Sequence, residues 1–355
     1  MIGTAETTAV PRRDNPVEIT GCSLATMAPM SISRLVVSLA VLTGVVCGQD
    51  SSAPERYIVK DTLGPMQDPN PAAQAMLDRI AWKPGSFTAE VHRGPKLVRV
   101  RYPSPKPRGD ARNDRVTMEW YAPKGPLADG GAPAVLVMHI LDGRMRVARI
   151  VAKSLARRGI HGFVMYMPDY GDRGDRRARH DVRRFVDRSL QGVADARRAH
   201  DVIARFPGVD GKRVGIQGTS LGGFGASVAG AIDGVFDPVF LLLSGADLAQ
   251  LIQSGKRDTA HIRRRFLASG LSMDETKKLV TQVDPIHLAH RLPVGRTWLY
   301  SARRDTVVPP ACATALAKAA KLTPKRHVWI SADHYTGLPY LPAVVLKLVK
   351  AIRGE

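Results

Sequence analysis

Residues 213–230 read RVGIQGTSLGGFGASVAG, and they place one serine, Ser220, between two glycines where a strand is expected to pass into a helix. A sharp strand-to-helix turn holds such a serine in a strained backbone conformation, with its hydroxyl projecting from the sheet edge. Side chains at Gly218 and Gly222 would collide in that turn. The helix that follows points its free N–H groups at the serine, and the first, from Leu221, can donate to a developing oxyanion.

The rest of the chain predicts a sheet around this turn. Residues 132–140 form a continuous apolar run, which is typical of a strand buried on both faces, and 161–171 predict the next buried strand. Residues 212–218, 238–245, 296–302 and 326–332 predict four further strands, and segments of helical spacing alternate with these strands. Three earlier segments alternate apolar and polar residues and predict antiparallel strands at the N-terminal edge, at 86–94, 96–104 and 115–123. The predicted fold class is α/β, with a mainly parallel central sheet, helices on both faces and a helical lid insertion at about 248–295, where the alternation breaks.

A serine nucleophile needs a base, and the base needs an orienting acid. His334 and Asp305 each follow a predicted strand directly. Because the carboxyl ends of parallel strands meet at one edge of the sheet, we expect both side chains close to Ser220. The chain order of serine, acid and histidine also fits a known triad arrangement. Asp247, which follows another strand, is the alternative acid. His139 ends the strand beside the serine, and we expect it to shape the neighbouring loop.

Five motifs carry a resemblance to a known family: VLVMHI, GTSLGG, DPIHLAHRL, RRDTVVPP and DHYTG. They fall within residues 116–352. With them the chain resembles the α/β-hydrolase superfamily, in its group of dienelactone-hydrolase and prolyl-oligopeptidase-like serine esterases. The resemblance implies the α/β-hydrolase fold, with Ser220 as the nucleophile, His334 as the general base and Asp305 as its orienter. The serine departs from the cysteine of true dienelactone hydrolases.

The same resemblance implies two oxyanion donors. The backbone N–H of Leu221 is one of them. The second comes, in this family, from the loop after the strand that ends here at His139, and the usual sequence there is of the His-Gly-X type. This chain has HILDG instead. We therefore expect Leu141 to supply the second donor, with Ile140 as the alternative.

The function implied is that of an exported serine hydrolase that cleaves carboxylic esters through an acyl-enzyme. One alternative is a serine peptidase of the prolyl-oligopeptidase kind, although no propeller or other large domain precedes the predicted core. Another alternative is a non-catalytic binding protein, since a fold does not guarantee chemistry. The intact set of Ser220, Asp305 and His334 favours an enzyme.

The N-terminal region predicts a signal peptide. Arg34 precedes an apolar run at 35–46, and Val46 and Gly48 fit positions −3 and −1 of a cleavage site. The run is too short to span a membrane, and Val46 is a poor lipobox residue, so export is favoured over an anchor, a buried helix or a lipoprotein. We expect a leader at 1–48 that includes an over-called start, a loose lead-in at 49–85, and a catalytic domain at 86–355. The mature protein would be periplasmic or secreted.

The composition of the chain limits the classes of partner that we expect it to bind. The net charge is +20, but only 6% of residues are aromatic, and no nucleic-acid-binding motif is present. Arginine clusters at 176–184 and 261–266 lie in connections that leave the carboxyl ends of strands, where they would steer an anionic substrate. We expect a small-molecule or carbohydrate-borne ester as substrate, and no nucleic acid, metal or cofactor. After loss of the leader only Cys312 remains, so no intrachain disulfide is expected.

Overall fold

The computed structural model describes residues 53–127, 129–174 and 182–355. These residues belong to one compact unit, Asp50–Glu355. The predicted leader at 1–48 lies outside the described residues, and so does most of the first arginine cluster. Within the described part of the chain, no helix is both long and apolar enough to cross a membrane.

Ten strands form one mixed sheet in the order β1-β2-β3-β4-β6-β5-β7-β8-β9-β10. The strands from β1 to β4 pair antiparallel, β4 pairs antiparallel with β6, and the remaining pairs are parallel. This arrangement confirms the predicted antiparallel edge and parallel centre. The strand bounds are β1 Glu55–Lys60, β2 Ser86–Arg93, β3 Val98–Pro103, β4 Arg115–Tyr121, β5 Ala132–Met138, β6 His161–Met165, β7 Val209–Thr219, β8 Val239–Leu242, β9 Thr297–Ala302 and β10 His327–Ile330.

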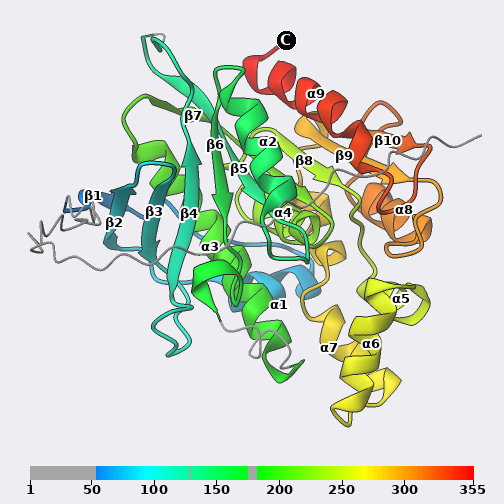
Figure 1. Cartoon of the computed structure of the whole chain (residues 1–355). Helices are drawn as coiled ribbons and strands as arrows, with labels where there is room; N and C mark the ends of the chain where they lie inside the picture. Colours follow the sequence, from blue (N-terminus) through cyan, green and yellow to red (C-terminus); the bar gives the residue numbers. More distant parts are fainter. Residues whose placement is uncertain (1–52, 128, 175–181) are drawn as a thin grey trace, which may run out of the picture. The chain divides into compact units, whose positions relative to one another are not determined.

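Helices cover both faces of this sheet (Figure 1). Helices α2 and α9 pack together on one face, and α3 and α4 pack together on the other. The insertion after β8 contains α5, α6 and α7, which contact one another. The helix bounds are α1 Pro71–Ile80, α2 Arg146–Ala156, α3 Phe185–Arg205, α4 Leu221–Ala231, α5 Leu248–Ser254, α6 Asp258–Ala268, α7 Met273–Thr281, α8 Pro310–Ala319 and α9 Leu341–Arg353.

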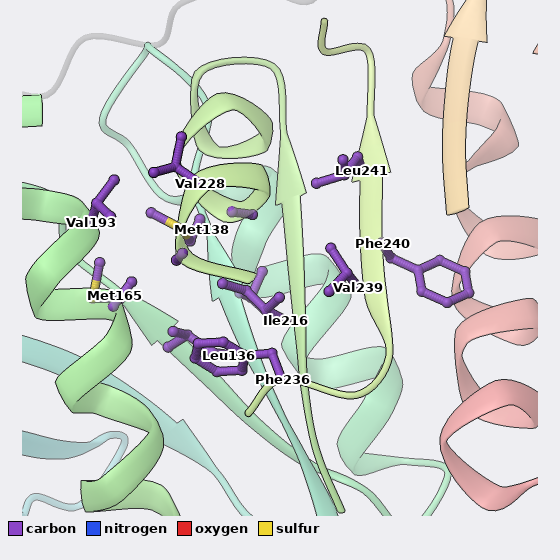
Figure 2. Close-up of a cluster of buried hydrophobic side chains, with 14 of the residues drawn as sticks. Leu136, Met138, Met165, Val193, Ile216, Val228, Phe236, Val239, Phe240 and Leu241 are labelled. Carbon is purple, nitrogen blue, oxygen red and sulfur yellow. The ribbon is translucent and has the colours of Figure 1, made fainter. Parts of the chain in front are cut away.

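The central strands are buried on both faces, as expected for the continuous apolar runs, whereas β10 at the edge of the sheet is mostly half-buried. Every residue of β5, β6 and β8 is buried. Figure 2 shows how neighbouring residues of β8 serve opposite faces, with Leu241 turned toward α4 and Phe240 turned away from it. Phe240 stacks on Trp298 of the next strand, with ring centroids 4.6 Å apart. The rigid centre of the sheet therefore fixes the strand ends that carry the candidate site.

The loose lead-in predicted at 49–85 is wrong for the part that the structure describes. β1 pairs with β2, and α1 begins at Pro71, after an Asn70 side chain that accepts hydrogen bonds from two backbone N–H groups of the first turn. The helix buries residues at helical spacing, namely Ala73, Met76, Leu77 and Ile80. Asparagine before proline is a strong helix-start signal, and the abundance of proline and aspartate in this segment obscured it.

Several arginines lie inside the protein rather than on its surface. Arg173 and Asp195 are both fully buried, and Nη2 of Arg173 lies 2.7 Å from Oδ2 of Asp195. Burial raises the pKa of Asp195, although the charge of Arg173 opposes that shift. Two other pairs join α3 to distant segments, namely Arg197 with Asp233 and Arg198 with Asp61, and Arg197 also pairs with Asp201 within the helix. The strongly basic composition is therefore partly a property of the interior.

We predict that Asp195→Ala lowers the free energy of unfolding by about 3–5 kcal/mol, because it leaves the Arg173 guanidinium buried without this carboxylate. Urea denaturation measures the change. The matched control is Asp210→Ala, which removes the solvent-accessible Arg213–Asp210 pair and should cost at most about 1 kcal/mol. Equal losses in the two variants would contradict this assignment.

Candidate active site

Ser220 lies at the junction of β7 and α4, in a backbone conformation that L-residues rarely adopt. Its φ is 51° and its ψ is −118°. The turn is held from both sides, since the Ser220 N–H donates to the carbonyl of Leu242 at 2.8 Å and the Ser220 carbonyl accepts from the N–H of Gly223 at 2.8 Å. A strained residue persists only where its surroundings fix it in this way.

The flanking glycines leave no room for a side chain. A Cβ on Gly218 would lie 2.1 Å from the carbonyl oxygen of Gly222, and a Cβ on Gly222 would lie 2.3 Å from the carbonyl oxygen of Met138. Both obstacles are backbone atoms, which no side-chain rotation can move. A side chain at either position would collide as expected from the sequence, and the two glycines therefore allow β5, β7 and the start of α4 to lie in close contact.

His334 and Asp305 lie next to Ser220 as the strand order predicts. Ser220 Oγ is 2.9 Å from His334 Nε2, and His334 Nδ1 is 2.7 Å from Asp305 Oδ2. Asp305 is 4% exposed and His334 is 9% exposed, so the imidazole–carboxylate contact is shielded from water while the serine is only half-buried. The three side chains come from the ends of β7, β9 and β10.

Backbone N–H groups hold the carboxylate of Asp305 in position. Asp305 Oδ1 accepts hydrogen bonds from the N–H groups of Val307 at 2.8 Å and Val308 at 2.9 Å, which leaves Oδ2 for the histidine. The alternative acid, Asp247, is used elsewhere, since its side chain accepts from the N–H of Gln250 and caps α5. Of the two acids, the structure brings Asp305 to His334.

The loop after β5 is oriented by His139, which is buried. Its Nε2 accepts a hydrogen bond from the N–H of Met167 at 3.2 Å, so its Nδ1 carries the proton and donates to the carbonyl of Ile140 at 2.7 Å. In a trans peptide the N–H points opposite to the carbonyl. The N–H of Leu141 is therefore turned away from the His139 ring.

A cavity of about 270 Å³ opens beside Ser220. Its walls come from β5, from α1 and α3 to α7, and from neighbouring loops, and they include Leu141 and Leu221. Sequence reasoning missed two of these walls, namely Met76 on α1 and the first half of α3. The apolar spacing of both helices was visible in the sequence, but spacing alone does not say which cavity a helix borders.

Two arginines border this cavity. Arg188 on α3 donates to Asp169 at 2.9 Å, and Arg265 belongs to the predicted cluster at 261–266. Burial and the nearby charge of Arg188 lower the pKa of Arg265. Another member of that cluster, Arg263, instead donates to three carbonyl groups around the end of α5. Within this cluster, Arg263 therefore stabilises the end of α5, whereas Arg265 borders the cavity.

The described residues contain no group of three or more His, Cys, Asp or Glu side chains placed to hold a metal ion. Cys312, the free cysteine of the described region, is buried, and burial raises the pKa of its thiol to about 12. At neutral pH such a thiol is not a nucleophile, because thiolate is the reactive form. Of Cys312 and Ser220, only Ser220 is therefore placed to act as a nucleophile.

Comparisons with known proteins give matches among solved structures. No family model matches the chain, and no curated protein matches it. An acetyl xylan esterase from Paenibacillus sp. R4 is similar over 79% of this chain and 92% of its own, with a TM-score of 0.58 and 15% identity. TT1662 from Thermus thermophilus is similar over 68% and 94%, with a TM-score of 0.50 and 18% identity. A puromycin hydrolase is similar over 76% of this chain but 46% of its own, with a TM-score of 0.53 and 17% identity.

Identities this low show the fold alone. Together with the strand order and the turn at Ser220, they confirm the predicted α/β-hydrolase fold: a mixed central sheet with helices on both faces. The resemblance stated from the sequence motifs is thereby confirmed at the level of the superfamily's fold.

Proposed function

We propose that this protein is a serine hydrolase that cleaves carboxylic esters. The observation that carries the proposal is the continuous chain of contacts from Ser220 Oγ through His334 to Asp305 beside an open cavity. Known triads use this connectivity of nucleophile, base and orienting acid. The fold neighbours include a protein named as an acetyl xylan esterase, which supports a hydrolase of this class.

In the proposed reaction Ser220 Oγ attacks the acyl carbon while His334 Nε2 takes its proton. The imidazolium then protonates the departing alkoxide, the carbon–oxygen bond of the ester breaks, and the acyl group remains on the serine. Water, deprotonated by His334, releases the acid and restores Ser220. Asp305 holds the imidazole with Nδ1–H toward it and stabilises its charged form.

Two backbone N–H groups are proposed to hold the oxyanion. Leu221 is the first residue of α4, and its N–H has no acceptor within the helix. Leu141 is the proposed second donor, because His139 binds the carbonyl of Ile140 and turns the N–H of Leu141 away from its own ring. Both residues border the cavity with Ser220. The same geometry favours Leu141 over Ile140.

We predict that a fluorophosphonate probe labels the wild-type protein, because the triad activates Ser220, and that Ser220→Ala abolishes the labelling. Gel fluorescence with intact-mass analysis measures both. A panel of p-nitrophenyl esters and aminoacyl p-nitroanilides then separates an esterase from a peptidase. A folded wild-type protein that takes no label would favour the non-catalytic binding protein.

We predict that Asp305→Asn lowers kcat/KM for a p-nitrophenyl ester by a factor on the order of 10³–10⁴, because an amide no longer fixes the required histidine tautomer. Asp247→Asn is the matched control, since asparagine also caps helices and this residue is bonded away from His334. A large loss in the Asp247 variant and a small one in the Asp305 variant would reverse the assignment.

We also propose that the substrate carries a negative charge. Arg188 and Arg265 both border the cavity, and the charge of Arg188 contributes to the lowered pKa of Arg265, so a nearby anion would stabilise both guanidinium groups. Such a substrate could be a half-ester or an ester on an acidic carbohydrate. The cationic side chains would raise its local concentration at the site.

Raising the salt concentration from low to moderate should therefore lower kcat/KM for a p-nitrophenyl half-ester of a dicarboxylic acid and leave a neutral ester unaffected. Arg265→Gln should lower the half-ester value several-fold. Arg264→Gln, which changes an exposed residue on the same helix outside the cavity wall, is the control. Salt independence for the half-ester would contradict the charge proposal.

Export is proposed on the sequence of residues 30–48 alone. When the full-length chain is expressed in a bacterium, the mature protein should begin at Gln49 and appear outside the cytoplasm. N-terminal sequencing of each cell fraction measures this. A cytoplasmic protein that keeps residues 30–48 would contradict export.

A further inference from the structure

We infer that the cavity beside Ser220 binds the acyl part of the ester, and that this acyl group is an extended apolar chain rather than an acetyl group. The inference rests on the proposed function, because it names the substrate class of the same site. It follows from which side of the serine the cavity occupies, what lines it and how large it is.

The position of the cavity relative to the triad identifies the acyl side. In the tetrahedral intermediate the acyl carbon holds Ser220 Oγ, the oxyanion, the leaving oxygen and the acyl chain. The leaving oxygen must lie near His334 Nε2 to receive a proton. Of the described residues, Ser220, Leu141 and Leu221 line the cavity, whereas His334 and Asp305 do not. The cavity therefore extends away from the leaving group, where the acyl chain must point.

The walls of the cavity are mainly apolar. Figure 2 shows Met138, Val193 and Val228 together between α3 and α4, and all three border the cavity. Two hydroxyls in the wall already bind protein groups, since Ser189 Oγ donates to the carbonyl of Phe185 and Thr259 Oγ1 donates to the carbonyl of Val307, each at 2.8 Å. Arg188 and Arg265 are the cationic part of the wall, so a half-ester would place its charged end beside them and its methylenes along the apolar remainder. Such walls favour a hydrocarbon over water.

The cavity is much larger than a very small acyl group requires. One water molecule occupies ~30 Å³ in the liquid, and a methyl group is of similar size. An acetyl methyl would leave most of the 270 Å³ unfilled, whereas a chain of several carbons would gain contacts along α3, α4 and the insertion helices. Each added methylene that enters the cavity should raise kcat/KM about three- to four-fold.

The test begins with wild-type protein whose active serine is titrated with the fluorophosphonate probe. Its kcat/KM is then measured on p-nitrophenyl acetate, butyrate, hexanoate and octanoate. We expect kcat/KM for the hexanoate ester to exceed that for the acetate ester by at least about fifty-fold, because the hexanoate chain adds four methylenes and each contributes the gain given above. Protein that labels fully but prefers acetate would overturn the inference and leave the proposed function standing.

Two variants test the location of the chain. Val193→Phe and Val283→Phe each place a ring in the cavity wall, from α3 and from the segment after α7. Each should lower the hexanoate-to-acetate ratio at least ten-fold. Val294→Phe makes the same change at an exposed site outside the cavity wall and should leave the ratio unchanged. Folded variants that both keep the wild-type ratio would overturn the inference.

Binding without turnover separates the two proposals further. Ser220→Ala should bind octanoate in calorimetry, with a negative heat-capacity change from apolar burial, and acetate should give no signal. If wild-type protein takes no fluorophosphonate label and Ser220→Ala still binds octanoate, hydrolysis fails while the apolar cavity is supported. If the probe labels and octanoate does not bind, the acyl assignment fails.

Discussion

The candidate site depends on the close approach of Gly222 to the end of β5. The space between this glycine and the backbone of Met138 admits no side chain, and the same is true between Gly218 and Gly222. This steric constraint sets the direction in which α4 leaves the sheet. That direction fixes the position of Ser220, the aim of the first N–H groups of the helix and the wall that α4 gives to the cavity. A change at this contact would displace all three together.

The central part of the fold and the site could be predicted because their signals are local. Apolar runs without alternation marked the parallel strands, and the positions of Ser220, Asp305 and His334 directly after three of them predicted their meeting. The topology rule for strand ends needs no knowledge of loop conformation. His139 was likewise expected to shape the adjacent loop, and it binds the carbonyl of Ile140.

What could not be predicted depends on partners far apart in the sequence. Arg173 reads as one of many arginines, and only its tertiary contact with Asp195 shows that it is buried. The abundance of proline and aspartate predicts a loop where α1 lies, although Asn70 and Pro71 mark a helix start. The apolar cavity is also a tertiary property. Its walls come from segments between Met76 and Val308, and no single segment reveals an enclosed space.

The spread of the site along the chain has a consequence for folding. Met76 borders the cavity from the first helix, Ser220 lies beyond the middle of the chain, and His334 follows the last strand. Contacts of such sequence separation form slowly, because long loops must close before the contacts contribute. During synthesis the apolar wall and the nucleophile leave the ribosome well before the base. A nascent chain therefore exposes an unfinished apolar cavity until the segment that carries Val307 and Val308, after β9, has been made, and this interval is when aggregation or chaperone binding competes with folding.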